Sequence, residues 1–273
     1  MSTQEASLDG MLWRVSARLG TAVRRALGRL GSMSWILYQC FWHGLRLRWH
    51  QMGVIFDVVR MQIRFTALEA LGLTCFAAFL MGGITLLQVF GQLSAFGAET
   101  YLSRLLARLV IRELGPLMVA IILIGRSGTA IAAEMATMKL SGEVDSLWAC
   151  GMNPIQFLLI PRILGGIISA FTLIVLFGAV ALLGGFFLAW LSLPLSWRAF
   201  LDSLGEVIGS RELAITALKS LVFGIFIPLI CAYCGLRVQA STTEIPQAVT
   251  RAAVYSLVVV LLGGALVSVM LYA

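Results

Sequence analysis

Five long apolar stretches dominate the distribution of hydrophobic and polar residues along this chain of 273 residues. They run over residues 66–90, 103–125, 163–191, 214–236 and 252–272. Each is about as long as the ~20 residues that an α-helix needs to cross the hydrocarbon core of a bilayer. The pattern therefore predicts an all-α integral membrane protein, with about five transmembrane helices in a domain at residues 66–273.

Polar positions gather in residues 1–65, which contain no uncharged run of spanning length. Residues 11–30, MLWRVSARLGTAVRRALGRL, interleave arginines with leucines at helical spacing. This spacing predicts a basic amphipathic helix that lies on the membrane surface, with an Arg-rich organellar transit peptide as the alternative. Residues 33–65 mix tryptophan, histidine and arginine with aliphatic side chains. They are predicted to be interfacial rather than spanning.

The distribution of charge predicts the orientation. Residues 1–65 hold nine arginines against three acids, whereas the remaining residues hold eleven Lys and Arg against ten acids. The basic residues of the later loops divide equally between the two sides of the membrane, so the arginine-rich N-terminal region determines the predicted orientation. Because Lys and Arg favour the cytoplasmic side and its anionic lipids, we expect a cytoplasmic N-terminus. An odd number of spans then places the C-terminus on the opposite side.

Composition narrows the classes of function. Charged residues make up 12% of the chain, against about 25% in soluble domains. The body of the chain has no basic stripe with interleaved aromatic residues, so the sequence does not predict a nucleic-acid partner. The sequence also lacks the common zinc-protease, nucleophile-elbow and phosphate-loop motifs. Cys231 and Cys234 have redox or zinc spacing but lie in an apolar run, which favours buried, inert thiols. We therefore expect neither an enzyme nor a metal or cofactor site in this chain.

The stretch SGEVDSLWACGMNP, from Ser141 to Pro154, lies in the longest predicted inner connection, at about residues 126–162. Ser141 is predicted to cap a helix over about 141–151. Gly151 suits the position just after the helix, and Pro154 follows it. In this interpretation Gly142 lies inside the helix, where it would cost about 0.5–1 kcal/mol relative to alanine.

The acids of this short helix do not form a catalytic pair. Glu143 and Asp145 are two positions apart, so their side chains diverge by roughly 200° around the helix. Val144, Leu147 and Trp148 are predicted to share the other side. The pattern leaves two interpretations open: a solvated connector, or a rigid element on which a cytoplasmic partner docks.

Charged residues inside the spans form a second candidate site. Arg112 and Glu113 lie in the second apolar stretch and Lys219 in the fourth. Such residues usually pair or face a polar cavity, because each costs about 2.5–3.5 kcal/mol to insert. Arg104 and Arg108 share a helix face with Arg112 and either line the same cavity or extend to the interface. The Gly-rich third stretch and GRSGTAIAAEMA, residues 125–136, predict close helix packing within one subunit or between two.

The block from Ile111 to Arg162 reads IRELGPLMVAIILIGRSGTAIAAEMATMKLSGEVDSLWACGMNPIQFLLIPR. It closely resembles the MlaE/YrbE permease family of Mce-type ABC transporters. The shared elements, in order, are R-E-L-G-P, G-R-x-G, A-A-E, T-M, E-x-D-x-L, G-x-(D/N)-P and P-R. LLQVFGQLSAFGAETY, residues 86–101, and LKSLVFGIFIPLICAYCGLR, residues 218–237, also look like the family. The resemblance extends over about residues 60–270.

This resemblance implies a permease subunit in the inner membrane of a Gram-negative-type bacterium. The implied partners are a second copy of the chain, cytoplasmic ATPase subunits that hold ATP and Mg, and a periplasmic Mce-domain assembly. The implied substrate is phospholipid. Family members use the helix with the E-x-D-x-L motif as a coupling helix that docks in the ATPase. In this chain the resemblance implies that Glu143, Asp145 and Leu147 dock in the ATPase, and that Gly151 and Pro154 shape the end of the coupling helix. Arg112, Glu113 and Lys219 match charges near the lipid cavity.

The chain departs from the family pattern in places. Gly142 stands where the family often has an acid, and LLGGALVS, residues 261–268, lacks the family's last-span Asp. The expected charge network is therefore incomplete, and Lys219 is left without an evident partner. The basic tail is not a family feature. Two alternatives stay open: a permease for sterols or solvents, and a membrane scaffold that tethers an ATPase or Mce protein without transport.

Overall fold

The computed structural model describes residues 52–94, 109–192, 209–239 and 241–272. Within them, five helical spans are long and apolar enough to cross a membrane: Phe56–Gln88, Val110–Leu140, Phe157–Leu188, Glu212–Leu236 and Thr242–Leu271. The predicted all-α class and the predicted number of spans are confirmed. The amphipathic helix expected over residues 11–30 lies outside the described residues, as do Arg104 and Arg108.

The first span begins before residue 66. Its segments are α2 (Met52–Ile63), the π-helical η2 (Arg64–Leu68) and α3 (Glu69–Ser94), which follow one another without a break. The 33 residues of Phe56–Gln88 extend about 50 Å at 1.5 Å per residue, more than the ~30 Å of a hydrocarbon core. The prediction that no span reaches residues 56–65 is wrong, because helical hydrogen bonding continues past the first charges. Arg60 and Arg64 are exposed, and such side chains can extend toward lipid headgroups.

The second span is one run of four segments, η4 (Leu109–Leu114), α5 (Gly115–Leu123), η5 (Ile124–Gly128) and α6 (Thr129–Leu140). Helix resumes with η6 (Ile155–Leu159) and α8 (Ile160–Ser192), which form the third span. Only α7 (Glu143–Ala149) and its flanking turns lie between them. The predicted connection at 126–162 is therefore too long. Arg126, which ended the apolar run, is neutralised by an ion pair with Glu69 and does not end the helix.

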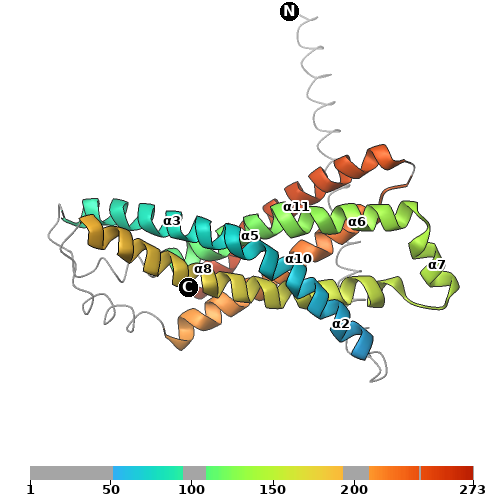
Figure 1. The fold of residues 1–273 in the computed structure, drawn as a ribbon, viewed down its shortest axis with the longest axis horizontal. Coiled ribbons are helices and arrows are strands. Elements are labelled where there is room, and N and C mark those ends of the chain that lie inside the picture. The colour runs from blue at the N-terminus through green and yellow to red at the C-terminus, as the bar shows by residue number, and fades with distance from the viewer. Residues whose placement is uncertain (1–51, 95–108, 193–208, 240, 273) are drawn as a thin grey trace, which may run out of the picture. The chain divides into compact units, whose positions relative to one another are not determined.

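The last two spans are α10 (Ser210–Leu236) and α11 (Ile245–Tyr272), joined through the 3-10 turn η7 (Thr242–Glu244). α11 begins at Ile245 rather than near residue 252, because its first two turns are helical although they include the polar residues Gln247, Thr250 and Arg251. Figure 1 shows that the ends of α6 and α8 at which α7 lies face the same way as the start of α2.

Glycines bring α3, α8 and α10 close together. α3 runs beside α8 in Figure 1. A Cβ atom at Gly185 would lie 2.9 Å from the carbonyl oxygen of Gly82, and one at Gly166 would lie 2.7 Å from that of Gly224. No side chain fits at such distances, so the small residues permit the approach. These glycines of the third span therefore pack inside one chain.

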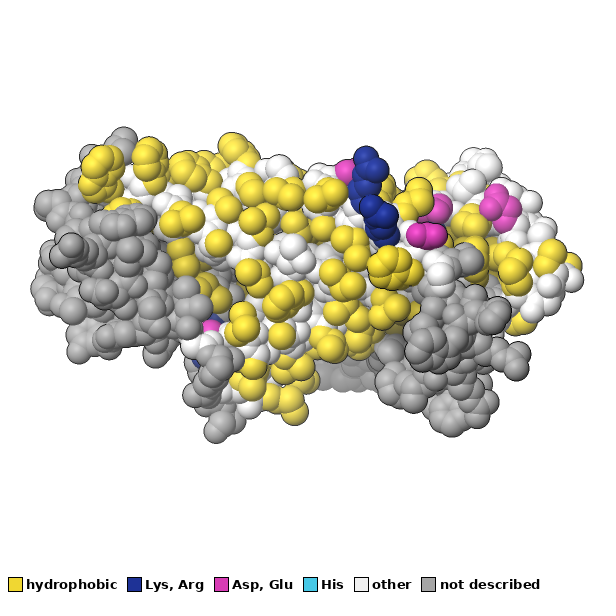
Figure 2. Space-filling model, turned by 60° about the horizontal axis from the view of Figure 1, so that its bottom comes forward, with side chains coloured by type: hydrophobic (Ala, Val, Ile, Leu, Met, Phe, Trp, Pro, Cys, Tyr) yellow, Lys and Arg dark blue, Asp and Glu magenta, His cyan; other side chains and the backbone are white. Residues whose placement is uncertain are grey.

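The outer surface of the spans is apolar. Figure 2 shows hydrophobic side chains over most of the described part of one face, with most of the charged ones gathered toward one end. Phe76, Leu262 and Met270 are 64%, 66% and 73% exposed. A contiguous exposed surface of this kind is suited to contact with lipid chains.

Candidate functional site

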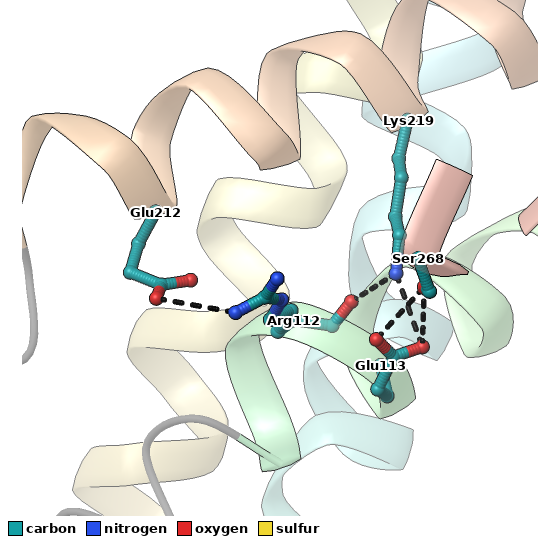
Figure 3. Close-up of polar contacts among 5 residues, drawn as sticks. All are labelled: Arg112, Glu113, Glu212, Lys219 and Ser268. Carbon is teal, nitrogen blue, oxygen red and sulfur yellow. Dashed lines mark hydrogen bonds and ion pairs between the residues drawn. The ribbon is translucent and has the colours of Figure 1, made fainter. Parts of the chain in front are cut away.

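A buried charge network joins three spans. Lys219 of α10 places its Nζ atom 3.1 Å from Oε2 of Glu113 in η4. Ser268 of α11 donates its hydroxyl to the same carboxylate, at 2.9 Å from Oε1 and 3.2 Å from Oε2. Figure 3 shows the Lys219 and Ser268 side chains converging on Glu113. The carboxylate is thus held by a cation and a hydroxyl from two different helices.

The R-E-L-G-P motif prepares a further acceptor for Lys219. Pro116 has no N–H, so the carbonyl oxygen of Arg112, four residues earlier, loses its α-helical donor. Nζ of Lys219 lies 2.5 Å from that oxygen. The Lys219 side chain is only 2% exposed, so its ammonium is satisfied by protein groups rather than by bulk water. A buried ammonium with two such acceptors avoids much of the cost of an unpaired charge in the membrane.

Arg112 faces the other way. Its Nη1 atom lies 3.8 Å from Oε1 of Glu212, with side-chain exposures of 7% and 14%. Figure 3 shows Glu212 on the same helix as Lys219, with Arg112 and Glu113 pointing to different partners. Two cations and two carboxylates therefore compensate one another in this part of the spans.

The prediction that Lys219 lacks a partner is wrong. Glu113 pairs with it directly, and the last span contributes Ser268 in place of a charged residue. The sequence reasoning also missed Glu212, although Glu212 and Lys219 are seven residues apart and so share a face of α10. That spacing could have identified Glu212. Ser268 carries no charge, so no pattern of charges could have singled it out.

The entrance to α7 differs from the prediction. Ser141 closes α6 and donates its hydroxyl to the Thr137 carbonyl oxygen at 2.8 Å, so it does not cap α7. Gly142 precedes α7 with φ of +76°, a left-handed conformation that glycine adopts without steric cost. Its carbonyl oxygen accepts from the N–H of Ser146 at 2.9 Å. Gly142 therefore forms the sharp turn between two helices instead of loosening one.

The exit from α7 follows the prediction. Gly151 has φ of +73°, and its N–H donates to the Trp148 carbonyl oxygen at 3.0 Å. The N–H of Met152 donates to the Leu147 carbonyl oxygen, also at 3.0 Å. This pair of bonds is the Schellman arrangement that ends helices with a left-handed glycine. Pro154 is buried and begins the next helical segment.

The side chains of α7 divide into an anchor and an exposed surface. Val144 is 8% exposed and fixes the helix against the bundle, whereas Trp148 is 58% exposed. Leu147 is half-buried between them, and Glu143 is exposed. Nζ of Lys139 at the end of α6 lies 2.9 Å from Oδ1 of Asp145. Because both ends of α7 are fixed by turns and Asp145 is tied to α6, the exposed acid and tryptophan have a defined orientation.

Two further ion pairs involve the spans that α7 connects. Nη2 of Arg162 in α8 lies 2.7 Å from Oε1 of Glu134 in α6, and the Arg162 side chain is 8% exposed. Arg126 pairs with Glu69 and donates to the Phe65 carbonyl oxygen at 3.1 Å. The A-A-E and P-R motifs are therefore brought together across the two spans that α7 connects. The sequence analysis predicted neither pair.

The described residues contain no cluster of three or more His, Cys, Asp or Glu side chains that could hold a metal ion. Cys231 and Cys234 are buried, and Sγ of Cys231 lies 3.5 Å from the Ser256 hydroxyl. The thiols that have redox spacing thus lie within the helix packing, and Cys40 is outside the described residues.

A family model described as permease MlaE matches residues 59–270. The intermembrane phospholipid transport system permease protein MlaE of Haemophilus influenzae is 30% identical over 241 residues, which cover 87% of this chain and 88% of that protein. A "probable ABC transporter permease protein" of Rickettsia typhi is 28% identical over 216 residues, 79% of this chain and 83% of that one. The chloroplastic protein TRIGALACTOSYLDIACYLGLYCEROL 1 of Arabidopsis thaliana is 26% identical over 197 residues, 72% of this chain and 56% of the plant protein.

Proposed function

This chain belongs to the MlaE permease family, and from that membership we propose that it transports phospholipid as the membrane subunit of an ABC transporter. It is a permease and not itself the catalyst, so ATP is hydrolysed on a separate ATPase chain that binds ATP and Mg. The observation that carries the proposal is the match over residues 59–270, which includes almost all of the five spans.

α7 is the proposed docking element for the ATPase. It connects two spans, is fixed at both ends, and presents Glu143 and Trp148 outward. Leu147 and Asp145 complete the proposed contact, while Gly151 and Pro154 set the direction of the exit. Movement of the ATPase would then reach α6 and α8 directly, because the Arg162–Glu134 pair links those helices next to α7.

The side of the membrane that carries α7 is proposed to be cytoplasmic. The start of α2 lies toward the same end of the spans as α7, and residues 1–65 contain nine arginines. Because Lys and Arg favour the cytoplasmic side, this arrangement puts the basic region and α7 where a cytoplasmic ATPase can meet them. The proposed location is the inner membrane of a bacterium, with a cytoplasmic N-terminus.

Co-purification tests the docking proposal. The double variant Glu143→Lys with Asp145→Lys should fail to retain the ATPase after detergent extraction, since it reverses both acids of α7. Asp57→Lys is the matched control, because Asp57 is an exposed acid near the start of α2 and should leave binding intact. Normal ATPase binding by the double variant would show that α7 is not the docking element.

The charge network is proposed to serve the lipid pathway. Arg112, Glu113 and Lys219 lie inside the spans, where ionisable groups are retained at substantial cost. A second copy of the chain is the proposed partner across this pathway, and an Mce-domain protein on the periplasmic side is the proposed donor or acceptor of lipid. The role of the network would be to hold η4, α10 and α11 in one arrangement until the ATPase drives a change.

Reconstitution tests the transport proposal. Together with its ATPase, the chain should transfer fluorescent phospholipid in an ATP-dependent manner, and Glu113→Gln should reduce the transfer. Glu244→Gln, outside the buried network, is the control. ATP-dependent transfer of sterol but not phospholipid would favour the alternative cargo, and ATPase binding without any transfer would favour a scaffold.

A further inference from the structure

A small cavity lies where α2, η2, η5, α8 and α10 meet, and its walls are mostly apolar with a few polar groups among them. Its lining includes Gln62, Thr66, Ser127, Gly166 and Gly224. The cavity measures about 10 Å3, which is close to the space that one water molecule requires. Its polar groups are few, so the case for a bound water depends on which of their hydrogen bonds the protein leaves unmade.

Two buried hydroxyls contribute to the cavity. Ser127 is 2% exposed, and its Oγ atom has no hydrogen-bond partner among the described residues. Thr66 is 4% exposed, and its Oγ1 atom accepts from Nε2 of Gln62 at 3.0 Å. The Thr66 hydroxyl therefore still has a hydrogen to donate.

A proline supplies the third polar group. Pro228 lies inside α10 and lines the same cavity. Since it has no N–H, the Gly224 carbonyl oxygen, four residues earlier, lacks its α-helical donor. That oxygen lies against Gly166, where a Cβ atom would be 2.7 Å away. The close approach of two glycines thus leaves a carbonyl acceptor at the cavity wall.

We propose that this cavity binds one buried water molecule, which accepts a hydrogen bond from the Ser127 hydroxyl and donates to the Gly224 carbonyl oxygen. The Thr66 hydroxyl is its third partner. Buried waters typically make two to four hydrogen bonds to protein groups that would otherwise be unsatisfied. In membrane helices, ordered waters commonly satisfy carbonyls freed by proline. The water therefore stabilises α10 where it is interrupted, and this assignment is independent of the transported substrate.

Hydroxyl-radical footprinting of the intact protein in nanodiscs tests the proposal, because radicals generated from a bound water label its neighbours even when they are buried. Phe223 lines the cavity and is 1% exposed, whereas Phe177 is 0% exposed and does not line it. The two rings have the same intrinsic reactivity. We expect Phe223 to be labelled several-fold faster than Phe177.

Two variants remove different partners of the water. Ser127→Val replaces the hydroxyl with a methyl group, and Pro228→Ala restores an N–H donor to the Gly224 carbonyl oxygen. Loss of the excess labelling of Phe223 in either variant supports the assignment. Equal labelling of Phe223 and Phe177 in the unmodified protein would overturn it, and this comparison does not depend on the folding of a variant. Fast labelling of Phe223 that persists in both variants would also overturn it, since the radicals would then come from water elsewhere.

Discussion

Replacement of Lys219 by methionine should destabilise the protein strongly. The substitution keeps most of the side-chain volume but leaves the Glu113 carboxylate with Ser268 as its remaining partner. Breaking a buried ion pair typically costs about 3–5 kcal/mol. Because the Glu113 side chain is 33% exposed and solvent screens part of its charge, we expect about 2–3 kcal/mol.

The chain contains a matched control for this experiment. Lys139 and Asp145 form an ion pair of similar length, 2.9 Å against 3.1 Å, but with side-chain exposures of 33% and 67%. Exposed pairs contribute about 0–1 kcal/mol, so Lys139→Met should cost little. The free energy of unfolding of each variant can be measured by equilibrium unfolding in mixed micelles, followed by tryptophan fluorescence.

A double-mutant cycle completes the test. Glu113→Gln removes the charge that Lys219→Met leaves behind, so the double variant should recover part of the lost stability. We expect a coupling energy of about 1–3 kcal/mol between the two positions. Equal costs for Lys219→Met and Lys139→Met, together with no coupling to Glu113, would refute the assignment of a buried, mutually stabilising pair.

Three other substitutions test the local geometry. Gly142→Ala should lower the free energy of unfolding by about 1–2 kcal/mol, because the φ of Gly142 is +76°. Gly53→Ala is the control and should be neutral or stabilising, because Gly53 lies in a helix with no atom within 4 Å of the new Cβ. Equal effects of the two substitutions would contradict the left-handed turn. Ser268→Ala should cost about 1 kcal/mol in the same unfolding assay through its lost hydrogen bonds, and no loss would argue against a contact between α11 and the network. Gly82→Ala should abolish the monodisperse size-exclusion peak, because the new Cβ would overlap the Ala181 backbone. Gly72→Ala is the control and should retain that peak, because there is open space around Gly72.

The sequence by itself determined the features that depend on neighbours along the chain. Hydropathy predicted five spans, and the Gly151 and Pro154 spacing predicted how α7 ends, because a helix end is built from residues within one or two turns. The same local reasoning erred at Gly142. Ser141 is equally suited to beginning a helix and to closing the previous one, and the choice depended on how far α6 extends.

Helix lengths were not determined by hydropathy. Apolar runs mark the part of a helix that contacts lipid chains, whereas the backbone stays helical as long as its hydrogen bonds continue. Arg126 and Arg162 interrupt apolar runs in the sequence, but each is neutralised by an acid from another segment. A charge within an apolar run therefore does not by itself mark the end of a span.

Only the tertiary structure decided how the candidate site is assembled. Glu113 and Lys219 are 106 residues apart, and Glu113 and Ser268 are 155 apart. Nothing local to any of the three encodes the meeting, which requires α10 and α11 to pack against the second span. The sequence thus determined which residues are costly to bury, and the packing of the helices determined which partners offset that cost.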